Sequence, residues 1–444
     1  MDSQKKKYIT SDELATHTHP HDLWISIHGA IYDVTHWAHI HPGGATPLLT
    51  FAGQDVTDVF TAFHPGETAS PHLHRLLTGH HLQNPTVSAV SQDYRTLSSH
   101  FSQLGLFHSK GHVALLTLTS IALLLLAVFY GVLRCSSAWA HMGSAVLLGL
   151  LWMQSSYVGH DSGHYQVMKN RNLNQFAQIL CGNCLTGISI AWWKWTHNAH
   201  HLSCNSLDHD PDLQHMPVFA VSPVFFNSIT SSFYGKKLNF DPISRFLISH
   251  QHLTFYPVMC FARINLFVQT IHLLVFSNRK VQNRGMNIAG VVVFWVWFSA
   301  LVRWVPNWWE RVMFVMVSFG VTSIQHVQFC LNHFGGEVYV GSPRGNEWCE
   351  KQSSGSLDIE CWVWMDWFFG GLQFQIEHHL FPRIPRCQLR RIAPMVKGFC
   401  EKHGLGYRRL SFWEANVWTV RTLRNAAMEA RKRNLLWEAL NTHG

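Results

Sequence analysis

The chain has 444 residues, which is too long for one ordinary domain and predicts two or more. Hydrophobic residues make up 47% of it against 14% charged, and the 19 Trp and 29 Phe are typical of a protein that contacts lipid, so much of the chain is expected in a bilayer. The net charge of +8 does not indicate nucleic acid, because the basic residues gather in the last third beside apolar segments, where an anionic membrane surface is the better partner.

Residues 8–83 are expected to form a small soluble α+β domain. The segments 23–28 and 31–34 flank a Gly-Ala pair and predict a β-hairpin. A His-Pro-Gly-Gly sequence begins at His41, where glycines allow the backbone to approach a flat ligand, and a second histidine, His64, follows. Two imidazoles that clamp one iron from opposite sides leave no position for oxygen, so the pair predicts a haem that transfers electrons.

A polar connector is expected at 84–111, and residues 112–444 are expected to form an all-α membrane domain. The run 113–133 carries no charge and is long enough to cross the hydrocarbon. The run 138–159 is similar, and the short link between the two predicts an antiparallel pair.

Three later apolar stretches complicate the count of membrane crossings; they lie at about 255–276, 286–305 and 311–331. Five crossings would leave the two termini on opposite sides, whereas the chemistry below needs both in the cytosol. One of these three stretches is therefore expected to enter the membrane only partway. About four transmembrane helices remain, with residues 160–250 as a cytosolic cap.

Three groups of residues have the spacing of one helix face. They are His160 and His164; His197, His200 and His201; and Gln375, His378 and His379. Seven imidazoles exceed the four ligands that one zinc ion needs, which favours two metal ions. Imidazole-rich sites suit iron, and iron can change oxidation state to activate oxygen, so we expect two non-haem iron ions supplied with electrons by the haem.

Spacing alone leaves further ligands and supporting carboxylates open. His333 ends the last apolar stretch and is a candidate ligand, as is His326; each is also explained as a polar residue near the headgroups. Nearby carboxylates would accept the second N–H of ligand imidazoles or would simply be solvated: Asp161, Asp208, Asp210, Asp212 and Glu377.

Two resemblances follow from these motifs. Residues 8–83 resemble cytochrome b5, which implies that His41 and His64 are the axial ligands of haem b. The pattern HxxxH, HxxHH, QxxHH behind such a domain resembles the front-end desaturases of plants over essentially the whole chain. That resemblance implies iron ligation by the seven clustered histidines, an essential Gln375 and a ligand role for His333.

The same resemblance implies the partners and the location. Oxygen is the expected co-substrate, and the electrons are expected from NADH through cytochrome b5 reductase. The protein is expected in the endoplasmic reticulum membrane, with the haem domain and the histidine groups facing the cytosol.

Plant enzymes of this type act either on carbon 8 of a sphingoid base or on carbon 6 of an acyl chain. Thr196, Ala191, His215 and Phe369 resemble the sphingolipid type, which implies Δ8 desaturation of a sphingolipid or ceramide. The alternatives are a Δ6 acyl-lipid desaturase and a lipid hydroxylase. An anchored electron carrier would need no clustered histidines, and a transporter would place its ligands at the bilayer midplane, so both fit less well.

Overall fold

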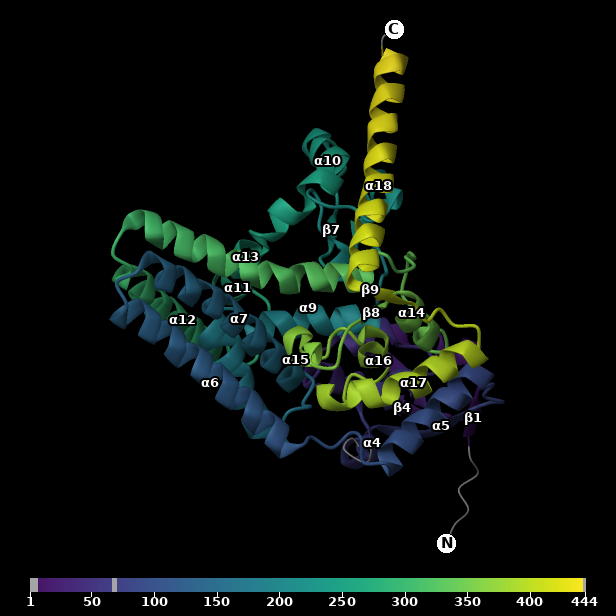
Figure 1. Cartoon of the computed structure of the whole chain (residues 1–444). Helices are drawn as coiled ribbons and strands as arrows, with labels where there is room; N and C mark the ends of the chain where they lie inside the picture. Colours follow the sequence, from purple (N-terminus) through teal and green to yellow (C-terminus); the bar gives the residue numbers. More distant parts are fainter. Residues whose placement is uncertain (1–6, 66–69, 442–444) are drawn as a thin grey trace.

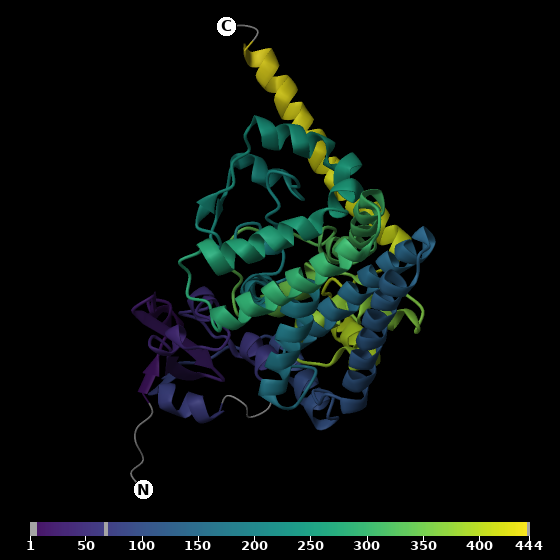
Figure 2. The ribbon, with the colours of Figure 1, turned by 90° about the vertical axis from the view of Figure 1, so that its left-hand side faces the viewer.

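The N-terminal part of the computed structural model, which describes residues 7–65 and 70–441, is built on a five-stranded sheet (Figures 1 and 2). The strands are β1 (Lys7–Ile9), β2 (Thr18–His19), β3 (Asp22–Ile27), β4 (Ala30–Asp33) and β5 (Leu77–Leu82), in the order β1-β5-β4-β3-β2. Within this sheet β1 and β5 pair in parallel, and the other neighbouring strands pair antiparallel. His28 and Gly29 both have positive φ angles and form the two-residue turn between β3 and β4, so the predicted hairpin is confirmed.

Short helices complete this domain and cover the sheet. They are α1 (Ser11–Leu14), η1 (Trp37–His39), α2 (Thr46–Thr50), α3 (Thr57–Phe63) and α4 (Ser70–Leu76). Ile25, Ile27 and Val59 are buried in its core. The domain thus places both predicted haem ligands, His41 after η1 and His64 after α3, in helical connections beside the sheet.

Four long helices lie side by side in the rest of the chain (Figure 1). They are α6 (Gly111–Arg134), α7 (Ala138–Gly163), α12 (Arg284–Trp304) and α13 (Trp308–His333). Within the described residues, α6, α12 and α13 are each long and apolar enough to cross a membrane. The chain is therefore a multi-pass membrane protein.

Helix α7 differs from the expected second span. It is long enough to cross, but it is not among the apolar helices of the described chain, because polar residues such as Gln154 and Ser155 occupy its second half. These side chains are buried against neighbouring helices and do not face lipid. Close contact makes this possible: a β-carbon on Gly149 would overlap Val321 of α13.

The stretch 255–276 does not form a straight span. It includes the end of α10 (Pro242–Met259), then α11 (Ala262–Ile271) and the π-helical turn η5 (His272–Phe276), and the two halves are bent by 80°. Arg279, which follows this stretch, is near the histidine-bearing helix α9 (Ile190–Leu202), since its guanidinium lies 4.2 Å from the ring centre of Trp195. This bend agrees with the expectation that one of the last three apolar stretches enters only partway.

The remaining elements cover one end of the long helices. They are α8 (Arg171–Ala177), η2 (Gln178–Leu185), η3 (Pro211–Leu213), η4 (Pro223–Asn227), β6 (Thr230–Ser231), β7 (Lys236–Lys237), α14 (Trp348–Ser354), β8 (Asp358–Glu360), α15 (Met365–Phe369), α16 (Gln375–Leu380), α17 (Arg386–Lys402), β9 (Arg409–Ser411) and α18 (Phe412–Asn441). Helix α18 packs along α10 and then projects beyond the other elements (Figures 1 and 2).

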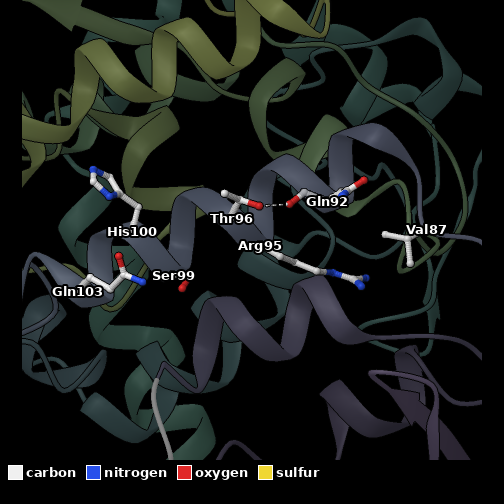
Figure 3. Close-up of a pocket in the computed structure, with 7 residues that line it drawn as sticks. All are labelled: Val87, Gln92, Arg95, Thr96, Ser99, His100 and Gln103. Atoms are coloured by element: carbon white, nitrogen blue, oxygen red, sulfur yellow. Dashed lines mark hydrogen bonds between the residues drawn. The ribbon is translucent and has the colours of Figure 1, made fainter.

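Helix α5 (Ala89–Gln103) lies in the expected connector and joins the two parts of the chain. Tyr94 donates a hydrogen bond to the carbonyl of Leu380 at 2.8 Å. On the other side, Arg95 Nε donates to the buried carboxylate of Asp58 at 2.6 Å. Arg95 also lines an open hollow along α5 (Figure 3), and this hollow contains none of the predicted site residues.

The N-terminal domain also contacts the loop before α14 directly. The amide N–H of Gly345 donates to Gln54 Oε1 at 2.9 Å. A β-carbon on Gly345 would overlap the backbone carbonyl of Asp55, and backbone cannot move aside as a flexible side chain can. A side chain at position 345 would therefore clash where the two domains meet.

We expect Gly345→Ala to loosen this contact. Overpacking of this kind costs about 1–3 kcal/mol, so amide hydrogen exchange should become faster at residues 50–56 and 342–348. The control is Gly398→Ala in α17, where a β-carbon meets no atom within 4 Å. Unchanged exchange in the Gly345 variant would show that the two domains do not pack here in solution.

Candidate metal centre

His41 and His64 face each other in the N-terminal domain with ring centres 6.3 Å apart. His41 Nδ1 donates to the carbonyl of Gly44 at 2.9 Å, and His64 Nδ1 donates to that of Phe60 at 3.2 Å. Each Nε2 is thereby left for a metal. A β-carbon on Gly43 would lie 2.9 Å from the His41 ring, so a larger residue at this position would displace the ring. These features fit an axially ligated haem.

The first histidine group in the membrane part has five members. Their ligand atoms lie within 4.8 Å of one another: His160, His164, His197, His201 and His378. His197 Nε2 is 3.0 Å from the Nε2 atoms of both His164 and His201. Nitrogens bound at about 2.1 Å to one ion, at right angles, are about 3.0 Å apart. His378 Nε2 is buried without a hydrogen-bond partner, so a metal ion would satisfy it.

The second group lies beside the first and comprises His200, His333 and His379, with Cys204. The Nε2 atoms of His200 and His379 are 3.2 Å apart. The Gln375 amide lies 3.0 Å from His333 Nε2, on the side of that ring opposite Cys204. His333 thus joins the cluster, whereas His326 belongs to neither group.

Hydrogen bonds at Nδ1 orient several of these imidazoles. His160 donates to Asp161 at 2.9 Å, and His200 donates to Asp210 at 2.8 Å. His379 donates to the side-chain oxygen of Gln352 at 2.7 Å. In each case Nε2 is left facing the cluster, as metal-ligating histidines require. Nothing in the spacing of the sequence identified Gln352 or Cys204, because both come from segments outside the three motifs.

The other suggested carboxylates have different roles. Asp208 accepts from the amide N–H of Gly341 at 2.8 Å and contacts no clustered imidazole. Asp212 remains 3.8 Å from His200 Nδ1. Glu377 points the other way and accepts from Tyr407 at 2.9 Å; burial, and then the nearby Asp358 carboxylate, raise the pKa of Glu377 well above its usual range.

A cavity of about 610 Å³ opens beside both groups. It is lined by His160, His200 and Gln375 at one side and by apolar residues such as Leu266 and Phe329 elsewhere. Its size and apolar walls suit a lipid chain. Two of the four positions that suggested a sphingolipid substrate, Thr196 and His215, line it; Ala191 and Phe369 are not among its lining residues.

Aromatic contacts join the predicted haem site to the histidine groups. Phe63 directly precedes His64, and its ring centre is 6.3 Å from that of His201. The ring centre of Trp348 lies 6.4 Å from that of Phe63, and the Trp348 indole N–H donates to the carbonyl of His201 at 3.1 Å. Phe63, the residue next to the predicted haem ligand His64, therefore contacts the first histidine group directly.

Two family models match the chain: "Fatty acid desaturase" over residues 137–411, and "Cytochrome b5-like Heme/Steroid binding domain" over residues 10–82. "Delta(8)-fatty-acid desaturase 2" of Arabidopsis thaliana is 64% identical, with all of both chains covered. "Acyl-lipid (9-3)-desaturase" of Borago officinalis is 54% identical over the same extent. "Delta 8-(E)-sphingolipid desaturase" of Emericella nidulans is 37% identical over 65% of this chain and 54% of its own.

We expect His378→Ala to remove non-haem metal from the first group, because its Nε2 has no other partner. Iron per chain, corrected for haem from the absorbance spectrum, should fall by about one while the haem content stays constant. The control is His209→Ala, since His209 belongs to neither group. Unchanged iron in the His378 variant would contradict this assignment.

Asp210→Asn should weaken metal binding by about 10- to 100-fold, because the amide no longer fixes the His200 ring as a carboxylate does. Titration of the metal-depleted protein with Fe²⁺ measures this change. Asp208→Asn is the matched control, because Asp208 accepts from Gly341 and not from a clustered imidazole. Equal affinities in the two variants would show that Asp210 does not support the metal.

Proposed function

Because this chain belongs to the fatty acid desaturase family and carries a cytochrome b5-like domain, we propose that it introduces a Δ8 double bond into the long-chain base of a sphingolipid or ceramide. Its relatives from Arabidopsis thaliana, Helianthus annuus and Borago officinalis named as Delta(8) desaturases are 59–64% identical over almost their full length. The observation that carries the proposal is the pair of buried histidine groups opening onto one apolar cavity.

We assign roles to the residues from this geometry. His160, His164, His197, His201 and His378 would hold one iron ion, and His200, His333 and His379 would hold the second, with Gln375 beside it. His41 and His64 would hold haem b in the domain at 8–83, joined through 84–111 to the desaturase domain at 112–444. The bound iron ions would supply oxygen activation, in which O2, two electrons and two protons convert two adjacent methylenes into a double bond and two waters.

The protein residues position the lipid chain and the ligand imidazoles, and they exclude water. The cavity holds the chain so that two carbons lie beside the histidine groups, and small errors in such positioning cost much of the rate. Asp161 and Asp210 hold His160 and His200 in the ligating orientation. Phe63 and Trp348 keep water from the path between the two domains by packing against His201.

Orientation and partners belong to the same proposal. The histidine groups lie at one end of α7 and α13, together with the N-terminal domain, and we place this end in the cytosol. A reductase that uses NADH would then reach the haem domain from solution. We place the protein in the endoplasmic reticulum membrane, where membrane lipids surround α6 and α12 and their exposed apolar side chains.

Δ6 desaturation of an acyl lipid is the second candidate. The relative named Acyl-lipid (9-3)-desaturase is 54% identical over the full length, so the overall fold does not separate the two activities. Thr196 and His215 face the cavity and match the sphingolipid type, which favours the long-chain base. A lipid hydroxylase would use the same groups and would differ only in its product.

Expression in yeast, followed by analysis of long-chain bases and fatty acids, tests the proposal. We expect new Δ8 long-chain bases, and their loss in His41→Ala and in His200→Ala. His209→Ala serves as the control, because His209 contacts neither metal group. New Δ6 fatty acids alone would establish the second candidate, hydroxylated bases would establish a hydroxylase, and full activity of His200→Ala would contradict the iron assignment.

A further inference from the structure

Arg263 is a buried cation in the membrane part of the chain. Its exposed fraction is 1%, and it lies at the start of α11, just after the 80° bend that follows α10. A charged side chain at membrane depth is expensive and usually marks a functional site, with its partner nearby. Arg263 therefore needs a group that compensates its buried charge.

The protein satisfies this guanidinium only in part. It lies over the ring of Trp152, 4.0 Å from the ring centre, and one NH2 donates to the carbonyl of Thr186. No carboxylate of the described residues forms an ion pair with it, and its Nε is buried without a hydrogen-bond partner. Buried N–H groups are nearly always paired, so a missing acceptor is indicated.

His326 presents a second unpaired nitrogen to the same space. Its Nδ1 is also buried without a hydrogen-bond partner, and both His326 and Arg263 line the cavity that reaches the histidine groups. His326 precedes His333 by two helical turns of α13, which is a rise of about 10 Å. The polar pair is thus set back from the metal groups along the cavity.

The chemistry of the two side chains defines the ligand. Arginine only donates hydrogen bonds, whereas a histidine nitrogen accepts or donates according to its tautomer. A hydroxyl group can accept from Arg263 and donate to His326, and an amide carbonyl can accept from Arg263. A long-chain base carries hydroxyls and an amide nitrogen near one end, while an acyl chain has only methylenes between its ester and the reacting carbons.

We propose that Arg263 and His326 bind a hydroxyl or amide group of the long-chain base, and so position the chain and select it over an acyl lipid. This inference rests on the proposed function and names how the substrate is recognised. The ester of an acyl lipid offers acceptors for Arg263 but no O–H donor for His326, so it leaves the His326 nitrogen unpaired, and sites built to bind a polar group reject analogues that lack it.

The test compares two ligands on the purified full-length enzyme. Intrinsic fluorescence of the tryptophans that line the cavity, Trp192, Trp193 and Trp195, reports binding of a ceramide with a hydroxylated base and of an acyl lipid of the same chain length. We expect Arg263→Met and His326→Leu to weaken ceramide binding by about 10- to 100-fold and His326→Leu to leave acyl-lipid binding unchanged. In yeast, the amount of Δ8 base that each of these two variants makes, relative to wild type, should fall in parallel.

Arg284→Met is the matched control, because Arg284 binds backbone carbonyls outside the cavity and should leave both affinities unchanged. Wild-type ceramide affinity in both cavity variants, or an equal loss for both lipids in His326→Leu, would overturn the inference. If Arg263→Met fails to fold, His326→Leu decides alone. A wild-type enzyme that makes no Δ8 base contradicts the proposed function, whereas the binding comparison tests the Arg263–His326 pair separately.

Discussion

The structure depends on bringing imidazoles from four helices, α7, α9, α13 and α16, to two adjacent buried points. Uncharged imidazole nitrogens that face each other at 3.0 Å cannot all be satisfied by one another. Metal ions would satisfy them together, which would couple metal binding to the folding of this region. The hydrogen bonds that imidazole Nδ1 atoms donate to Asp161, Asp210 and Gln352 serve the same constraint, because each fixes the ring nitrogen that faces away from the cluster.

The membrane helices serve this centre as supports. Helices α7 and α13 approach each other closely at Gly149, and both end at the histidine groups, where His160, His164 and His333 lie. Helix α6, by contrast, exposes leucines along much of its length and contributes no ligand. The bend between α10 and α11 opens the cavity beside the metal groups and places Arg263 in its wall.

The N-terminal domain is held by a small number of defined contacts. The Asp58–Arg95 pair, the Tyr94 hydrogen bond and the close approach at Gly345 place α3 against the end of α9. As a result, Phe63 contacts His201. This arrangement suits a fused electron donor, because packing within one chain fixes the distance between the two sites. A separate donor would have to reach the second site by diffusion.

Local sequence determined the hairpin at β3 and β4, the helix at 113–133 and the helical spacing of the three histidine motifs, because turn residues, apolar length and i, i+4 repeats are local properties. Only tertiary structure divided the histidines into two groups, recruited His333 and Gln352, and separated Glu377 from the metal groups. It also decided that α7 buries its polar half and that Arg263 faces the cavity. Contacts between distant segments set these features, and spacing along one segment does not encode them.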